Sequence, residues 1–181
     1  MENNSMSLPV SVLNKYPNSI FVETGTYLGG GVATALGCKS FSKIYSIEVY
    51  KPYYTKAKKK FSNNTKVKLY YGDSLEVLEK LIDNIDVPVT FWLDSYTFPA
   101  LNKKKGIATM PLVNELDIIR SHKLNIHTIL VNNRSLMGSI NEWKNVTEHR
   151  IIRMLKVINP EYSIIYENSN LAKDDIVVAT L

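Results

Sequence analysis

Residues 20–31 read Ile-Phe-Val-Glu-Thr-Gly-Thr-Tyr-Leu-Gly-Gly-Gly, an apolar run that ends in an acid and then turns through glycines. The run Ile20–Glu23 is typical of a buried strand, and the glycine-rich turn opens a helix predicted over Gly30–Gly37. Such a turn lets the backbone approach a ligand closely and presents free N–H groups. A purely structural turn has the same composition, so this segment alone does not define a site.

The same order of apolar run and helical pattern continues along the chain, which is typical of βαβ units and a parallel sheet. Further strands are predicted at Lys43–Glu48, Val67–Tyr71, Val89–Asp94 and Thr128–Val131. Further helices are predicted at Pro52–Phe61, Leu75–Asn84, Pro111–His122 and Thr147–Ile158.

The C-terminal part departs from this alternation. Tyr162–Glu167 and Ile176–Thr180 are both strand-like, and the stretch between them is too short for a crossover helix. We therefore expect an antiparallel hairpin here. The predicted fold class is α/β, with a doubly wound, mostly parallel seven-stranded sheet and an antiparallel C-terminal hairpin, in one domain over residues 1–181.

The composition is that of an ordinary globular protein, with 45% hydrophobic and 22% charged residues in 181. Cys38 is the one cysteine, so no intrachain disulfide is possible and a reducing compartment fits. No segment reaches the length of a membrane span, and the N-terminus lacks the pattern of a signal peptide. These features predict a cytoplasmic protein without membrane insertion.

The formal net charge of +5 owes much to lysines in two clusters, at residues 56–60 and 103–105. Tyr54, Ala57 and Phe61 recur at helical spacing, so the first cluster is predicted to be the solvated back of an amphipathic helix. The second cluster lies in a segment without periodicity, and it fits either a solvated surface or a loop beside a site.

Acids stand at the ends of the first four predicted strands, where doubly wound sheets bind their ligands. Glu48 follows Glu23 by 25 residues, a place where an acid accepts hydrogen bonds from both ribose hydroxyls or caps the next helix. Asp73 suits an exocyclic amine such as that of adenine, and equally the N-cap of a helix. Asp94 ends an apolar strand and is expected to face the crevice.

Four ordered segments resemble the motifs of class I S-adenosylmethionine-dependent methyltransferases: residues 21–30, 45–48, 72–74 and 91–94. More narrowly, they resemble the macrocin O-methyltransferase-like branch, whose members act on sugar hydroxyls. The resemblance extends from Ile20 to the closing strand at residues 174–179, and it implies S-adenosylmethionine as the cofactor.

The resemblance also implies which residues contact the cofactor. These are Glu23, Thr24, Gly25, Thr26, Gly29, Glu48, Asp73, Ser74 and Asp94. In this assignment the glycine-rich turn surrounds the methionine part, Glu48 holds the ribose, and Asp73 with Ser74 holds the adenine.

The catalytic and metal positions depart from the family pattern. The family has Asp-x-His where this chain has Asp94-Ser95-Tyr96, so Asp94 is the expected base or metal-linked activator, and Tyr96 is expected to orient the acceptor. Two aspartates after the fifth strand are replaced by Asn132 and Asn133. With Asp94 these two form a candidate site for Mg²⁺ or Mn²⁺, weakened by the loss of two carboxylates.

Two further expectations concern the surroundings of the site. Residues 95–109 are long for a loop between strand and helix, and are predicted to form an acceptor-binding lid. His122, His127 and His149 are weaker candidates for the base, because His122 and His127 flank elements where surface or capping histidines are common.

The sequence therefore predicts an S-adenosylmethionine-dependent O-methyltransferase acting on a sugar or glycan hydroxyl, with a small-molecule or glycan acceptor. One alternative is a catalytically degenerate binding protein, favoured by the missing histidine and the two asparagines. Another is a nucleic-acid methyltransferase, which fits the positive charge. Residues 94–97 do not resemble the Asn/Asp-Pro-Pro-Tyr signature, however, so nucleic acid is not the expected partner. A nicotinamide dehydrogenase is disfavoured because Tyr27 replaces the second glycine of Gly-x-Gly-x-x-Gly.

Overall fold

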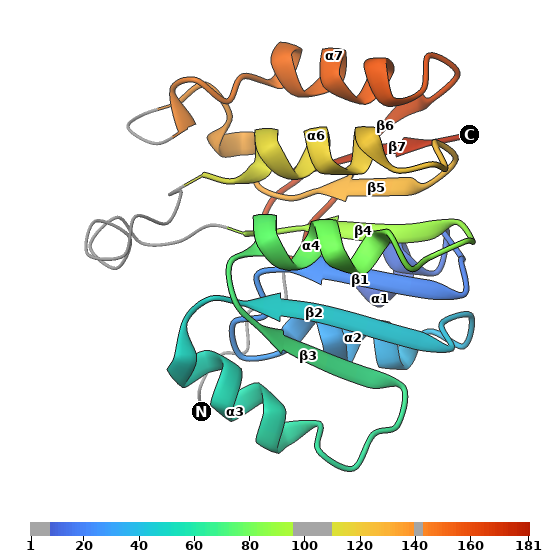
Figure 1. The fold of residues 1–181 in the computed structure, drawn as a ribbon. Coiled ribbons are helices and arrows are strands. Elements are labelled where there is room, and N and C mark those ends of the chain that lie inside the picture. The colour runs from blue at the N-terminus through green and yellow to red at the C-terminus, as the bar shows by residue number, and fades with distance from the viewer. Residues whose placement is uncertain (1–7, 96–109, 140–142) are drawn as a thin grey trace.

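A seven-stranded sheet forms the centre of the molecule in the order β3-β2-β1-β4-β5-β7-β6 (Figure 1). This computed structural model describes residues 8–95, 110–139 and 143–181. The strands are β1 Ile20–Thr24, β2 Lys43–Glu48, β3 Val67–Tyr71, β4 Val89–Leu93, β5 Thr128–Val131, β6 Ser163–Glu167 and β7 Ile176–Thr180. The strands β1 to β5 are parallel, and β7 pairs antiparallel with both β5 and β6. The predicted fold class is confirmed.

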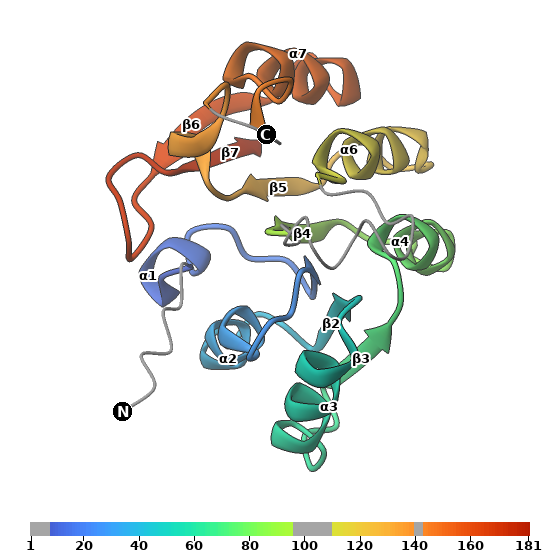
Figure 2. The same ribbon diagram turned by 90° about the vertical axis from the view of Figure 1, so that its left-hand side faces the viewer.

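Helices cover both faces of the sheet, with α4, α6 and α7 on one face and α1 and α2 on the other, while α3 lies beside the edge strand β3 (Figure 2). Their bounds are α1 Val10–Leu13, α2 Gly30–Gly37, α3 Lys51–Lys60, α4 Ser74–Ile82, α6 Leu112–Ser121 and α7 Glu148–Ile158, and a 3₁₀ turn η1 covers Arg134–Leu136. Within the described ranges, none of the helices has the length and apolar character to cross a bilayer. The short elements α1 and η1 were not predicted.

Successive side chains of a strand point to opposite faces of the sheet, so the strands contribute to two separate hydrophobic cores. Val22 of β1 packs with Leu116 of α6 on one face. Its neighbour Phe21 packs with Leu13 and Val32 on the other face. Both faces of the sheet are thus buried, which explains why the central strands read as continuous apolar runs.

The helix α3 confirms the interpretation of the first lysine cluster. Ala57 is buried against the sheet, whereas the lysines at positions 56, 58, 59 and 60 are exposed. The second cluster, at 103–105, lies outside the described residues.

Candidate functional site

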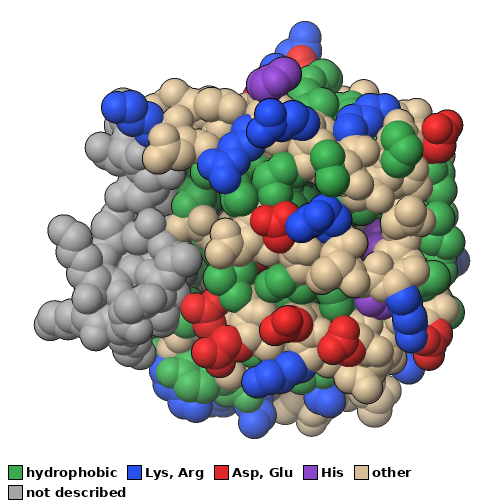
Figure 3. Space-filling view, turned by 45° about the horizontal axis from the view of Figure 1, so that its top comes forward, with side chains coloured by type: hydrophobic (Ala, Val, Ile, Leu, Met, Phe, Trp, Pro, Cys, Tyr) green, Lys and Arg blue, Asp and Glu red, His purple; other side chains and the backbone are tan. Residues whose placement is uncertain are grey.

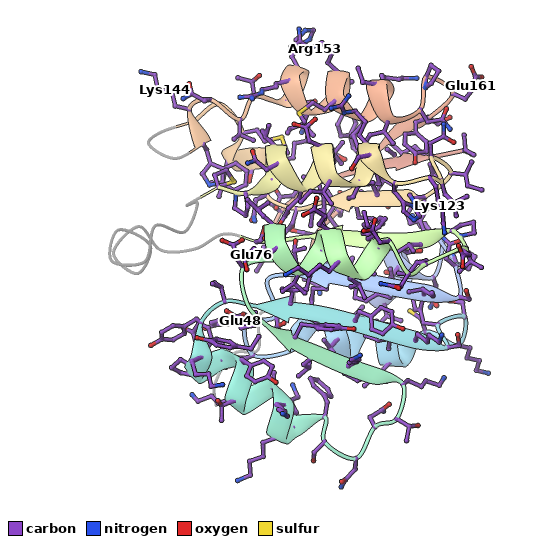
Figure 4. The ribbon with its side chains drawn as sticks, viewed as in Figure 1. Glu48, Glu76, Lys123, Lys144, Arg153 and Glu161 are labelled. Carbon is purple, nitrogen blue, oxygen red and sulfur yellow. The ribbon has the colours of Figure 1, made fainter. Side chains whose placement is uncertain are left out.

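The carboxyl ends of four adjacent parallel strands, β3, β2, β1 and β4, form one edge of the sheet. This edge brings Asp73, Glu48, Glu23 and Asp94 together in that order along the sheet. Figure 4 shows Glu48 at the carboxyl end of β2, on the same side of the molecule as Glu76 in the first turn of α4. The predicted convergence of these acids on one edge is observed.

Gly25 allows the turn after β1 to lie against the end of β4. Its φ of +86° is in the left-handed region, and a Cβ atom at this position would lie 2.5 Å from the backbone oxygen of Asp94. The N–H groups of Gly25 and Thr26 both donate to the carbonyl oxygen of Ile47, at 3.0 and 3.2 Å. A side chain at position 25 would therefore force the two strand ends apart.

Glu48 is held in one orientation by backbone donors. Its Oε2 accepts the N–H of Tyr27 and its Oε1 accepts the N–H of Tyr50, each at 2.7 Å. Burial raises the pKa of Glu48, while these N–H donors act in the opposite direction. Tyr50 directly precedes α3, so the helix-capping alternative is observed in part. The backbone N–H of Val49 acts on the same carboxylate. A carboxylate has about four acceptor positions, so a ribose hydroxyl can still donate to it.

Glu23 lies within β1 and is only 1% exposed, beneath the first turn of α2. Its Oε2 accepts a hydrogen bond of 2.5 Å from Ser46 Oγ, which also lies 2.5 Å from Thr26 Oγ1. Burial raises the pKa of Glu23 well above its ordinary value, and the charges of Asp94 and Glu48 raise it further. In this structure Glu23 is a buried packing residue, and its predicted contact with the cofactor stays a prediction.

Asp73 is the N-cap of α4, since its Oδ1 accepts the N–H of Leu75 at 2.9 Å. The capping alternative for Asp73 is therefore observed. Its role toward adenine, together with Ser74, stays a prediction.

Asp94 directly follows β4 and is held by two side-chain amides. Its Oδ1 accepts hydrogen bonds from Nδ2 of Asn132 at 2.8 Å and from Nδ2 of Asn133 at 3.1 Å. Asp94 borders a small cavity of about 10 Å³, open to solvent, and the other residues lining it are Leu93, Ser95, Met110, Leu112, Asn132, Asn133 and Trp143. The carboxylate therefore has a fixed orientation beside a wall of both apolar and polar side chains.

The residues predicted to bind a metal do not fit a divalent cation as they lie. The amide nitrogens of Asn132 and Asn133 face Asp94, so a cation at this point would meet one carboxylate and two N–H donors. In the part of the chain that the structure describes, no three His, Cys, Asp or Glu residues cluster as a metal site. The metal site stays a prediction.

Glu115 of α6 belongs to this edge and was missed by the sequence reasoning. It is fully buried, and its carboxylate accepts hydrogen bonds from Ser95 Oγ at 2.6 Å and Thr24 Oγ1 at 3.2 Å. A signal was present, because Glu115 falls on the same helical face as Leu112 and Leu116. A charged residue on an apolar helix face is a site candidate.

His122 and His127 form a buried pair at the opposite edge of the sheet, 9% and 1% exposed. His127 Nδ1 accepts the N–H of Val89, so its Nε2 carries the proton and donates to His122 Nδ1 at 2.9 Å. His122 Nε2 then donates to the carbonyl oxygen of Ile85 at 3.1 Å. His122 is the C-cap of α6, so the capping alternative is observed for it, whereas the expectation for His127 is wrong, because this residue is buried.

Tyr96 and the remainder of the predicted lid, residues 96–109, lie outside the described residues. The roles predicted for them stay predictions.

Comparison with known proteins bears on the fold. No protein-family model and no curated protein matches the chain. Among solved structures, an O-methyltransferase from Bacillus cereus with bound S-adenosylhomocysteine (SAH) aligns with all of this chain and 82% of its own, at a TM-score of 0.68 and 13% identity. The O-methyltransferase TomG from Streptomyces achromogenes, in complex with SAM, covers all of this chain and 81% of its own, at a TM-score of 0.62 and 12% identity. The chain has the class I methyltransferase fold.

The class I methyltransferase fold does not by itself set the reaction. Spermidine synthase from Thermotoga maritima aligns with 97% of this chain and 57% of its own, at a TM-score of 0.62 and 12% identity. The finer resemblance to sugar methyltransferases is not tested by these comparisons. The residues at the carboxyl edge of the sheet, and not the fold, decide the reaction.

Proposed function

We propose that this chain is an S-adenosylmethionine-dependent O-methyltransferase. The observation that carries the proposal is the position of Asp94, whose carboxylate is fixed by Asn132 and Asn133 beside a cavity. The backbone of the same residue lies against Gly25 of the glycine-rich turn. A proton acceptor and a cofactor-binding turn therefore adjoin each other at one point of the sheet edge.

The residues of the edge fit an adenosyl cofactor. Glu48 would hold the ribose hydroxyls, since its carboxylate is already oriented by two backbone N–H donors. The turn from Gly25 to Gly29 would surround the methionine part, and Asp73 with Ser74 would lie at the adenine. When bound, the cofactor supplies a methyl group on a positively charged sulfur.

Methylation of an alcohol requires alignment of the hydroxyl with the methyl group and removal of the hydroxyl proton. In the proposed mechanism Asp94 accepts that proton. Two amide donors on one oxygen complement an ionised carboxylate and prevent it from turning away. Met110, Leu112 and Trp143 form the apolar part of the cavity wall beside Asp94.

We further propose a sugar or glycan hydroxyl as the acceptor. Support comes from the resemblance of residues 21–30, 45–48, 72–74 and 91–94 to the macrocin-like branch. A nucleic-acid acceptor is less well supported by the charge distribution. On the face drawn in Figure 3, acidic side chains gather over α4 and basic side chains over α7, so this face carries no continuous basic surface.

A second candidate is a binding protein that retains the cofactor crevice without turnover. The specific observation in its favour is the triplet Asp94-Ser95-Tyr96, which lacks the histidine of the family pattern. The two functions differ in whether a methyl group is transferred.

Calorimetry with SAH, followed by transfer of a labelled methyl group from S-adenosylmethionine to a panel of monosaccharides and oligosaccharides, tests the proposal. We expect SAH binding, and transfer to at least one saccharide that is lost in the matching deoxy sugar. Binding without transfer to any acceptor favours the binding protein. A protein that does not bind SAH contradicts both candidates.

A further inference from the structure

Glu115 links three segments that border the cofactor crevice. Its carboxylate accepts hydrogen bonds from Thr24 Oγ1 at the end of β1 and from Ser95 Oγ beyond β4. The side chain of Ser74 at the start of α4 also acts on this carboxylate and lowers its pKa. Thr24 and Glu115 are 91 positions apart in the sequence, so only the folded chain creates this arrangement.

Each of the three hydroxyl residues is the direct neighbour of a residue assigned to the crevice. Thr24 precedes Gly25, Ser74 follows Asp73, and Ser95 follows Asp94. We propose that Glu115 is a positioning residue, which through these three hydroxyls sets the relative positions of the glycine-rich turn, the N-terminus of α4 and Asp94. This inference rests on the proposed function, because it assigns the three segments to one cofactor crevice.

The arrangement responds to protonation of Glu115. An ionised carboxylate can accept hydrogen bonds from all three hydroxyls at once. When a proton from solvent binds one carboxyl oxygen, that O–H must itself donate, and at least one hydroxyl has to turn away. Burial raises the pKa of Glu115 to about 7, with the three hydroxyl donors lowering it and the charge of Asp73 raising it.

The charged groups at the strand ends and at the start of α4 are acidic, whereas α7, which packs against α6, carries basic side chains such as Arg153. The acidic groups are Glu23 on β1, Asp73 before α4 and Asp94 after β4, and on α6 itself the exposed pair Asp117 and Arg120 lies in the following turn. Of these, the charge of Asp73 acts on Glu115. These other groups titrate both in the wild type and in a variant that cannot ionise at position 115. The difference between the two pH profiles therefore reports the ionisation of Glu115.

The experiment measures SAH affinity by calorimetry across about pH 5.5 to 8.5 for the wild type, Glu115→Gln and the control Glu79→Gln on the exposed side of α4. We expect wild-type and Glu79→Gln affinity to weaken together as the pH falls through the ionisation of Glu115. Glu115→Gln should lack this transition and bind about tenfold more weakly at the alkaline end, because charge-assisted hydrogen bonds are replaced by neutral ones.

Ser95→Ala provides a second test that does not depend on folding of the glutamine variant. It removes one donor from the ionised form of Glu115, so the midpoint of the pH transition should move to higher pH. Identical pH profiles and affinities for the wild type and Glu115→Gln, or an unchanged midpoint in Ser95→Ala, overturn this inference and leave the proposed function standing. A wild-type protein that does not bind SAH at any pH overturns the proposed function and the inference with it.

Discussion

The side-chain amide of Asn132 donates a hydrogen bond of 2.8 Å to Oδ1 of Asp94. The oxygen of the same amide is buried and has no hydrogen-bond partner among the described residues. Asn132 is neutral and lies beside the proposed base Asp94, at a position where the methyltransferases that the sequence resembles have a carboxylate. Its amide donor stabilises the negative charge of Asp94, so single substitutions at either residue test the site.

Replacement of Asp94 tests its role as the base. Asp94→Asn keeps the size of the side chain but removes the proton acceptor, so methyl transfer should fall by about 100-fold or more. The exposed Asp83→Asn at the end of α4 is the matched control and should keep full activity. Rates of methyl transfer at saturating S-adenosylmethionine provide the measurement. Full activity in Asp94→Asn would contradict the role.

Replacement of Asn132 tests the metal prediction. Asn132→Asp removes a donor and places a second negative charge beside Asp94, which should lower the free energy of unfolding by about 1–3 kcal/mol. Mn²⁺ should restore stability in this variant, because the pair of carboxylates can now ligate a cation. The control Asn132→Leu should not respond to Mn²⁺ in a thermal melt. Stabilisation of the wild type by Mn²⁺ would show instead that the native residues do bind a metal.

Gly25 should tolerate no side chain. Gly25→Ala combines a φ of +86° with a Cβ contact of 2.5 Å to the backbone of Asp94, and should cost about 2 kcal/mol or more of unfolding free energy. Gly37→Ala is the control, since its Cβ would lie 3.6 Å from Val10 Cγ2, and this change should stabilise by up to about 1 kcal/mol. Urea titration measures the free energy of unfolding of both variants, and it should be lower for Gly25→Ala than for Gly37→Ala. Equal stability would mean that the turn after β1 can shift without cost.

The buried histidine pair should make stability depend on pH. Burial lowers the pKa of His127 from 6.5 to about 4, with the neighbouring His122 adding to the effect. The folded state therefore favours neutral His127. The resulting stabilisation, at most about 3 kcal/mol, is present above pH 6.5 and is lost as the pH falls toward 4.

His127→Gln isolates this contribution, because glutamine does not titrate. Urea titrations between about pH 4 and 7 should show that the wild type loses more stability on acidification than the variant does. Glu115 acts in the opposite direction over much of this range, since its raised pKa favours the folded state at low pH. The informative quantity is therefore the difference in unfolding free energy between the wild type and His127→Gln at each pH. If this difference did not change with pH, a buried neutral His127 would be excluded.

Much of the fold was predictable because hydrophobic periodicity and turn residues are local properties. The bounds of β2 and β3 were predicted as observed, since each apolar run is delimited by polar or glycine residues. The helix α1 was missed, because its four residues are too few to show a helical period. At the site, the sequence placed four acids at strand ends, and a parallel sheet necessarily brings such ends to one edge.

The sequence by itself determined which residues occur at that edge, because the alternation of strands and helices predicts parallel strands, whose carboxyl ends lie at one edge. Tertiary structure alone decided what surrounds each of them. Glu115 accepts hydrogen bonds from the hydroxyls of Thr24 and Ser95, the amide nitrogens of Asn132 and Asn133 donate to Asp94, and His122 contacts His127. Burial and hydrogen-bond partners come from residues far apart in the chain. For this reason protonation and side-chain orientation are properties of the folded protein.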